Sequence, residues 1–171
     1  SDLIDAMRWA GGLTVPGVPE NPTPAKLLNI SLVVERACSA ALQSAVDELS
    51  ARGVVIVTAV GNENTEASRF APANCIGTLT VGASAISGDR APYSNYGVAV
   101  DLSAPGGTNT RSGAILSAYD EGRTTPTQSG YASTAGTSMA APHVSGVLAA
   151  ILAAEPDLPR ADLFTLLFAN L

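Results

Sequence analysis

The sequence predicts an α/β domain with a mostly parallel sheet and helices on both of its faces. Three observations support this prediction. Short runs rich in β-branched and other apolar residues alternate with longer segments of helical periodicity. The run at 54–59 is almost wholly apolar, which is typical of a strand that is covered on both sides. The length of 171 residues matches about one ordinary domain, and no internal repeat or shift in composition marks a second one.

The first elements of the chain are a helix, a loop and a strand. Residues 2–10 have an amphipathic pattern, and Gly11-Gly12 ends the predicted helix. The segment 14–24 carries four prolines, so we expect a loop over the surface. The short apolar run 26–32 follows and fits a buried strand.

A second helix is predicted over 39–52, because Ser39 is placed to cap its start and Gly53 to end it. Three further strands are predicted from β-branched apolar runs at 54–59, 78–83 and 98–103. Polar loops separate them, and a stretch rich in Gly, Ser and Thr follows. The chain then predicts two helices, at 137–153 and 159–171.

Composition and charge exclude several classes of protein. The chain is 46% hydrophobic and 14% charged, which excludes a disordered chain of low hydrophobicity and high net charge. Its formal net charge is −6, and no cluster of Lys and Arg offers a surface for nucleic acid or for anionic lipid. The most apolar stretches, 54–60 and 144–154, are shorter than the roughly 20 residues that a bilayer requires. We therefore expect neither a nucleic-acid partner nor a membrane partner.

Two polar residues stand where chemistry could occur. Ser138 follows a loop and opens an apolar helix, where the helix dipole stabilises negative charge. The simpler interpretation of Ser138 is a helix N-cap. Asn62 follows the buried strand, at the sheet edge where α/β proteins place their ligand sites. Taken alone, Asn62 is better explained as a turn residue, since asparagine tolerates the left-handed backbone conformation.

Two segments together resemble one family. Gly136-Thr-Ser-Met-Ala-Ala-Pro-His-Val-Ser-Gly146 resembles the nucleophile segment of the subtilisin-like serine proteases (subtilases), and 55–64 resembles the segment that carries their oxyanion asparagine. The likeness continues in collinear order through four more segments: 70–75, 80–84, 93–97 and 101–106. It covers nearly the whole chain, with the secreted bacterial members as the most similar type and some proteinase K character.

The resemblance implies a subtilisin-like fold and a role for each matching residue. Ser138 would be the nucleophile that attacks a peptide carbonyl, and Asn62 would donate its side-chain amide to the oxyanion. Thr137 would support this oxyanion site, and Met139 would be an oxidation-sensitive neighbour. The family also has a cis X–Pro bond where this sequence has Ala71-Pro72.

Two segments are implied as walls of a cleft for a peptide or protein substrate, which would add to them as an extended strand. They flank the side chain of the residue whose carbonyl is attacked, with Phe70 close by. The wall residues that match the family are Ser31, Leu32, Val33, Ala59, Val60 and Gly61.

A structural calcium site and a disulfide are implied as well. The carboxylate of Asp101 and the backbone carbonyls of Ile76 and Thr78 match a site of the proteinase K type, although Asp101 could instead cap a strand end without metal. The spacing of Cys38 and Cys75 alone leaves a disulfide and two buried thiols equally open. The resemblance favours the disulfide and a secreted, extracellular protein.

The first departure from the family concerns the catalytic base. The sequence has one histidine, His143, and it stands five residues after Ser138 on the same predicted helix. This spacing places it about 140° around the helix axis and about 7.5 Å along it, too far for a base that must be within hydrogen-bond reach. We therefore interpret His143 as a packed structural residue.

The triad Asp and His are consequently expected on an N-terminal part of the same catalytic domain. Residues 1–171 would be the C-terminal part of that domain, a serine endopeptidase fragment that is inactive by itself, and the chain begins without Met. The N-terminal strands of the family's sheet would be missing, which leaves the strand at 26–32 as an open apolar edge.

The second departure is Val33-Val34-Glu35, where the family usually has glycines because the substrate backbone approaches closely. Either the cleft accepts only small side chains or it is impaired. An alternative function follows from both departures, namely a non-catalytic subtilase-like domain with a peptide-binding or structural role. An unrelated α/β hydrolase is excluded, because Ser138 lacks the Gly-x-Ser-x-Gly elbow.

Overall fold

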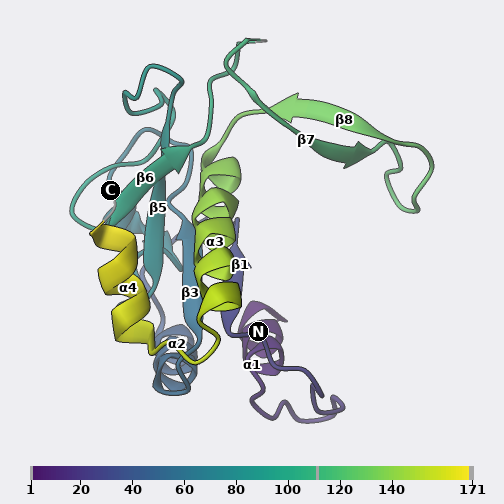
Figure 1. The fold of residues 1–171 in the computed structure, drawn as a ribbon, viewed down its shortest axis with the longest axis vertical. Coiled ribbons are helices and arrows are strands. Elements are labelled where there is room, and N and C mark those ends of the chain that lie inside the picture. The colour runs from purple at the N-terminus through teal and green to yellow at the C-terminus, as the bar shows by residue number, and fades with distance from the viewer. Residues whose placement is uncertain (1, 111, 170–171) are drawn as a thin grey trace.

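The computed structural model describes residues 2–110 and 112–169. Its centre is a sheet of four parallel strands in the order β1-β3-β5-β6 (Figure 1). These strands are β1 (Leu27–Ile30), β3 (Val55–Ala59), β5 (Leu79–Ser84) and β6 (Leu102–Pro105). Each pairs in parallel with the next in the order.

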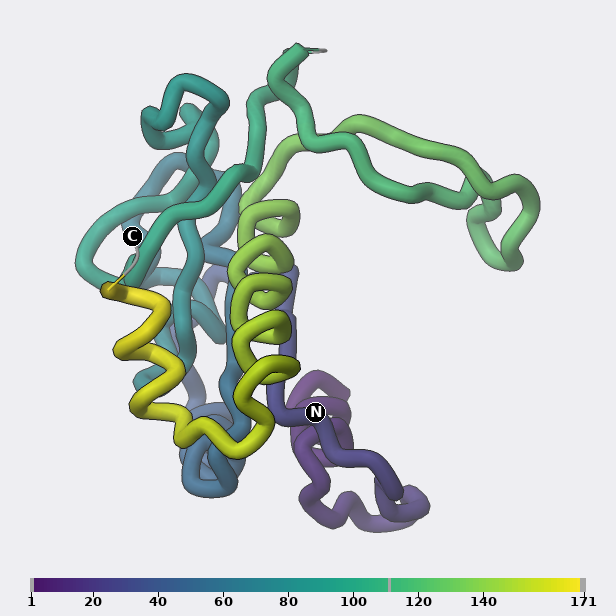
Figure 2. Tube along the Cα trace, viewed as in Figure 1, coloured from purple at the N-terminus to yellow at the C-terminus, as the bar shows by residue number. Residues whose placement is uncertain are grey.

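Helices cover both faces of the sheet. On one face lie α3 (Thr137–Ala154) and α4 (Arg160–Phe168), and on the other lie α1 (Asp2–Ala10) and α2 (Ala40–Ala51). Figure 2 shows α3 and α4 in front of the sheet, in green and yellow. The α/β architecture predicted from the sequence is confirmed.

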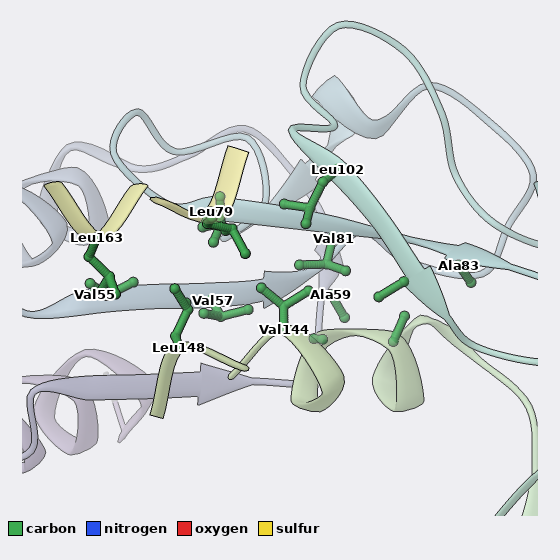
Figure 3. Close-up of a cluster of buried hydrophobic side chains, with 14 of the residues drawn as sticks. Val55, Val57, Ala59, Leu79, Val81, Ala83, Leu102, Val144, Leu148 and Leu163 are labelled. Carbon is green, nitrogen blue, oxygen red and sulfur yellow. The ribbon is translucent and has the colours of Figure 1, made fainter. Parts of the chain in front are cut away.

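The strand β3 separates two hydrophobic cores, and all five of its residues are buried. Successive side chains of a strand point to opposite faces. Val55, Val57 and Ala59 accordingly join the core under α3 and α4, where Leu148 and Leu163 meet them (Figure 3). Ile56 joins the second core with residues of α1 and α2. This two-sided burial explains the almost wholly apolar sequence of the strand.

Cys38 and Cys75 form a disulfide with an S–S length of 1.98 Å. It links the segment just before α2 to the segment before β5 and settles the choice that spacing left open. The Ala71–Pro72 peptide bond is cis, as the resemblance implied.

Three predicted boundaries are wrong, and the first is the strand expected at 26–32, which ends at Ile30. The strand expected at 98–103 begins only at Leu102, because Gly97 adopts a positive φ of 107° and Val100 N–H closes a turn onto its carbonyl. Val98 is fully exposed in that turn. The last helix ends at Phe168 rather than at 171, and residues 170 and 171 lie outside the described part of the chain.

Four short strands were not predicted. β7 (Ile115–Asp120) and β8 (Ser129–Thr134) form an antiparallel hairpin that projects away from the body of the molecule (Figure 1). β2 (Val34–Glu35) pairs antiparallel with β4 (Phe70–Ala71), which follows the short 3₁₀ helix η1 (Ala67–Arg69). The hairpin is exposed or half-buried along its length and rich in Ser, Ala and Thr, so it lacks the one-sided apolar alternation that marks a strand.

The helix α3 begins at the predicted residue and ends one residue later than predicted. It has 18 residues and a mean hydropathy of 1.4, so by length and composition alone it could cross a membrane. It packs against β1, β3, β5 and β6, which is the position of a core helix in a globular domain. The expectation that every apolar stretch falls well short of membrane length was therefore too strong for this helix.

Within the described residues, β1 pairs only with β3 and forms one edge of the sheet. Leu27 and Leu28 are half-buried on it. An edge strand of this composition exposes backbone groups and apolar side chains that another strand could cover.

Candidate active site

The predicted site residues lie at one edge of the sheet. Ser31 follows β1, and Gly61 and Asn62 follow β3 after one further residue. The carboxyl ends of neighbouring parallel strands meet at the same edge, and the N-terminus of α3 returns to it. This arrangement brings three segments that are distant in sequence to one place.

Ser138 lies in the first turn of α3 and is half-buried. The N-cap of the helix is Gly136, so the interpretation of Ser138 as an N-cap is wrong. Among the described residues, the backbone N–H of Ser138 has no hydrogen-bond partner. A free N–H at a helix start is a donor to which an anion can bind.

Thr137 fixes the side chain of Asn62. The N–H and the hydroxyl of Thr137 donate to Asn62 Oδ1 at 2.9 and 3.0 Å, and Gly61 N–H donates to Thr137 Oγ1 at 3.1 Å. Thr137 is fully buried and Asn62 is exposed. Because Oδ1 is held toward Thr137, the Nδ2 amide group has no partner in the described part of the chain and is available as a donor.

The alternative interpretation of Asn62 as a left-handed turn residue is wrong. Positive φ values occur on either side of it, at Gly61 (102°) and Asn64 (51°), and not at Asn62 itself. A Cβ at Gly61 would overlap the amide of Asn95, so glycine is required there by space as well as by conformation.

Ser31 and Ser138 exchange two hydrogen bonds. The hydroxyl of Ser138 donates to the Ser31 carbonyl at 3.0 Å, and the hydroxyl of Ser31 donates to the Ser138 carbonyl at 3.1 Å. The second bond has a cause in the sequence. Pro142 stands four residues after Ser138 in α3 and has no N–H, so the usual helical partner of the Ser138 carbonyl is missing. The Ser31 hydroxyl takes that place.

Two residues that the sequence did not reveal hold Ser31. Asn29 Nδ2 donates to Ser31 Oγ at 2.8 Å, and Ser145 Oγ donates to Asn29 Oδ1 at 2.9 Å. The chain of bonds connects α3 to β1 at two points, at Ser138 and at Ser145. It fixes the distance between Ser138 and the segment of Ser31, which is one of the two expected walls of the cleft.

We expect Ser31→Ala to lower the free energy of unfolding by about 0.5–1.5 kcal/mol, because the Ser138 carbonyl loses its donor. In a Pro142→Ala background the helix regains a backbone donor for that carbonyl, so the same substitution should cost less. Urea unfolding of both single variants and the double variant measures this coupling. The exposed Ser129→Ala, combined with Pro142→Ala, is the control and should show no coupling. Equal costs of Ser31→Ala in both backgrounds would contradict the account.

The structure brings some of the predicted wall residues to the site and directs others elsewhere. Val33 is half-buried, and its Cγ2 lies 3.1 Å from where a Cβ on Gly61 would be. Leu32 is 55% exposed and lines a separate cavity of about 370 Å³ with residues of α1 and α2. The side chains of Ala59 and Val60 are buried in the protein interior.

His143 is exposed, so the prediction that it is packed is wrong. Its Nδ1 lies 2.7 Å from the Met139 carbonyl, one helical turn earlier. It faces away from the packed side of α3, whose buried residues include Ala140 and Val144. A hydrogen bond to its own helix replaces the packing that we expected.

Asn95 positions the loop that carries Asn62 and was not singled out from the sequence. It is fully buried, and its Oδ1 accepts from the N–H groups of Glu63 and Thr65, both at 3.0 Å. Its Nδ2 donates to the Val60 carbonyl at 3.0 Å and to Glu63 Oε2 at 2.7 Å. Only its place in the segment 93–97 could have indicated such a role.

Tyr93 supports the start of α3 in a similar way. Its hydroxyl lies 2.8 Å from the carbonyls of Gly106 and Gly107, and Gly136 N–H donates to the Gly106 carbonyl at 3.0 Å. Burial raises the pKa of the Tyr93 phenol, and the nearby backbone amide of Gly136 opposes this in part. The neutral phenol, which keeps its O–H donor, is therefore the form that hydrogen-bonds to these glycine carbonyls.

The predicted calcium ligands lie on neighbouring segments. Asp101 Oδ2 accepts from Thr80 N–H at 2.7 Å, and the Ile76 carbonyl accepts from Gln43 Nε2 at 2.8 Å. Burial raises the pKa of the Asp101 carboxyl. No group of three His, Cys, Asp or Glu side chains gathers within 2–110 and 112–169, so any cation here would depend largely on backbone oxygens.

The chain is similar to known proteins in both sequence and structure. Residues 1–170 match the model of the subtilase family. An extracellular basic protease of Dichelobacter nodosus is 48% identical over 94% of this chain, and an extracellular protease of Xanthomonas campestris pv. campestris is 43% identical over 91%. This chain spans 26% of the length of each.

A solved protease structure from Pseudoalteromonas arctica is also similar, with a TM-score of 0.90 and 41% identity. The match covers 95% of this chain and 49% of the solved one. A cold-adapted subtilisin-like serine proteinase matches 80% of this chain, with a TM-score of 0.67 and 38% identity.

Proposed function

The chain belongs to the subtilase family, and on this premise we propose that it carries the nucleophile and the oxyanion donors of a secreted serine endopeptidase. The observation that supports the proposal best is the contact of three segments around Ser138. Thr137 holds Asn62 beside the start of α3, and Ser31 holds Ser138 from the other side. The disulfide and the extracellular relatives support secretion.

In this proposal the Ser138 hydroxyl attacks the carbonyl carbon of a peptide bond. The negative charge that develops on the carbonyl oxygen is stabilised by two donors, Asn62 Nδ2 and the backbone N–H of Ser138. Thr137 acts through Asn62, because its two bonds to Oδ1 keep Nδ2 turned toward the reacting atoms. These groups are fixed before the substrate arrives, so little reorganisation is needed during the reaction.

The base that takes the Ser138 proton has to come from another part of the protein. The single histidine of this sequence, His143, forms a hydrogen bond with the Met139 carbonyl. The Ser138 hydroxyl donates to the Ser31 carbonyl. We propose that residues 1–171 form the C-terminal part of a catalytic domain whose N-terminal part supplies His and Asp. The free edge of β1 is where that part would extend the sheet. The chain's coverage of about half of the solved relative agrees with this.

Complementation tests the proposal. We expect no peptidase activity from the chain alone, and measurable turnover of a peptide substrate when the preceding part of the same protein is added. The Ser138→Ala chain, mixed in the same way, is the control and should stay inactive. A mixture that forms a stable complex and still has no activity would contradict the proposal.

A second candidate function is a non-catalytic domain that binds peptides. It is favoured by Val33, whose side chain occupies space beside Gly61 at the site. In that case the complex with the N-terminal part would cleave no peptide, and the Ser138→Ala substitution would leave its affinity for peptides unchanged. The complementation experiment therefore separates the two functions.

We also propose a structural Ca²⁺ site formed by the Asp101 carboxylate and the carbonyls of Ile76 and Thr78. The donor set fits, because Ca²⁺ prefers oxygen ligands and accepts backbone carbonyls. One carboxylate oxygen of Asp101 is bonded to Thr80 N–H, and the other has no partner among the described residues. When bound, the cation would hold the loop before β5 against the start of β6.

Calcium should therefore raise the thermal stability of the full-length protease. Ca²⁺ at 100 times its Kd adds about 2.7 kcal/mol to the folded state. We expect a clear rise in Tm for the wild type, measured by calorimetry, and none for Asp101→Asn. The exposed Asp157→Asn is the matched control and should respond like the wild type. An equal rise in Asp101→Asn would place the cation elsewhere.

A further inference from the structure

We propose that Val33 limits the protease to substrates with a small side chain at the residue whose carbonyl is attacked. The inference rests on the proposed function and adds the class of substrate. It concerns the space between the two segments that contact the start of α3. One is the segment of Ser31 to Val33, and the other contains Gly61 and Asn62.

A substrate carbonyl that reaches both Ser138 Oγ and Asn62 Nδ2 has to lie between these segments. Ser31 touches Ser138 directly, and Gly61 touches Thr137, the residue before it. The side chain next to that carbonyl consequently has these two segments as its nearest walls. Any atom that fills the space between them competes with the substrate.

Val33 extends into this space. Exposure alternates along the segment, with Ser31 and Val33 half-buried and Leu32 and Val34 more than half exposed. Leu32 and Val34 line a different cavity, on the side of α1 and α2. Val33 is turned the other way, and its Cγ2 lies 3.1 Å from the position of a Cβ on Gly61. A valine methyl therefore faces the opposite wall at close range.

The two walls cannot easily separate to admit a large side chain. Val34 and Glu35 pair with Ala71 and Phe70, and the Glu35 carboxylate is bonded to Arg69. The other wall is held by the Gly61 bond to Thr137 and by Asn95, whose amide donates to the Val60 carbonyl. A β-branched side chain has few rotamers, so Val33 has little freedom to turn aside.

These contacts predict a preference by size. A glycine or alanine substrate residue needs little room between the walls, whereas phenylalanine or leucine would overlap the Val33 methyl groups. One extra or missing methylene in a hydrophobic pocket changes kcat/KM by about 10–200-fold, and phenylalanine adds a whole ring to the side chain of alanine. We expect kcat/KM of the wild type for an alanine substrate to exceed that for the matched phenylalanine substrate by at least about tenfold.

The test uses the full-length protease and tetrapeptide anilides that differ only in the last residue, Ala, Leu or Phe. Val33→Ala and Val33→Gly should raise kcat/KM for Phe progressively, so that the Phe/Ala ratio increases by about 10–100-fold in the glycine variant. The reaction with the alanine substrate should change little. Val98→Gly removes a fully exposed valine from the turn before β6 and should leave every ratio unchanged.

The outcomes separate the inference from the function on which it rests. Activity with an unchanged Phe/Ala ratio across the Val33 series would overturn the inference and leave the proposed function in place. A wild type that already prefers phenylalanine would do the same. No hydrolysis of any substrate by a correctly folded protease would contradict the proposed function itself.

Discussion

Ser138→Ala is expected to lower kcat of the complete catalytic domain by about 10⁶, the size of the loss known for the nucleophile of subtilisin. In the proposed mechanism alanine removes the atom that would form the acyl-enzyme, and it leaves the surrounding contacts almost intact. The Ser31 carbonyl loses one donor, but the Ser31 hydroxyl keeps its bond to the carbonyl of residue 138. Hydrolysis of a chromogenic peptide under saturating substrate measures the effect.

The matched control for this substitution is Ser129→Ala, on the exposed hairpin strand β8. It makes the same chemical change at an exposed residue that pairs with Asp120 and makes no contact with Ser138, so it should leave kcat unchanged. Residual activity of Ser138→Ala within tenfold of the wild type would show that another nucleophile operates. The geometry around Thr137 and Asn62 would then need a different explanation.

If Asn62 is an oxyanion donor as proposed, Asn62→Ala should lower kcat by about 10²–10³ with little change in KM, the loss known for the oxyanion asparagine of subtilisin. The interaction forms only when the oxyanion does, so binding of the substrate is not affected. This variant also removes the acceptor of two Thr137 bonds. An unpaired buried donor lowers the free energy of unfolding by about 1–3 kcal/mol, so the Tm of the Asn62→Ala variant should fall as well.

A second substitution separates these two consequences. Asn62→Asp keeps an oxygen that Thr137 can bind and removes the amide donor. We expect the aspartate variant to lose kcat at least as strongly as the alanine variant, since a carboxylate beside the oxyanion is repulsive. Its Tm should stay closer to that of the wild type. A kcat near the wild-type value for Asn62→Asp would exclude the amide as an oxyanion donor.

Much of the fold followed from local sequence signals. The strand at 55–59 is recognisable because both of its faces are buried, which leaves no polar residue except Thr58. The helix α2 is recognisable by its cap, and Ser39 Oγ indeed accepts from Leu42 N–H at 3.2 Å. Such features are set by a few neighbouring residues. A single sequence is sufficient to predict them.

Other features depend on contacts between distant segments, which a single sequence does not display. The Ser31–Ser138 pair exists because Pro142 leaves a carbonyl unpaired on a helix that meets β1. The hairpin β7–β8 is held by pairing between two strands that are exposed or half-buried along their length, so no apolar pattern marks it. The prediction of a packed His143 failed for the same reason. The uncovered side of α3 becomes apparent only in three dimensions.

The most direct test of the account is the rate at which a fluorophosphonate probe modifies Ser138, followed by peptide mapping. The folded chain alone should react very slowly, because its serine has a carbonyl as partner and no base. Addition of the N-terminal part should accelerate labelling at Ser138 by several orders of magnitude, and Asn62→Ala should reduce that gain. Equal labelling rates with and without the N-terminal part would contradict the claim that this chain carries one half of a divided active site.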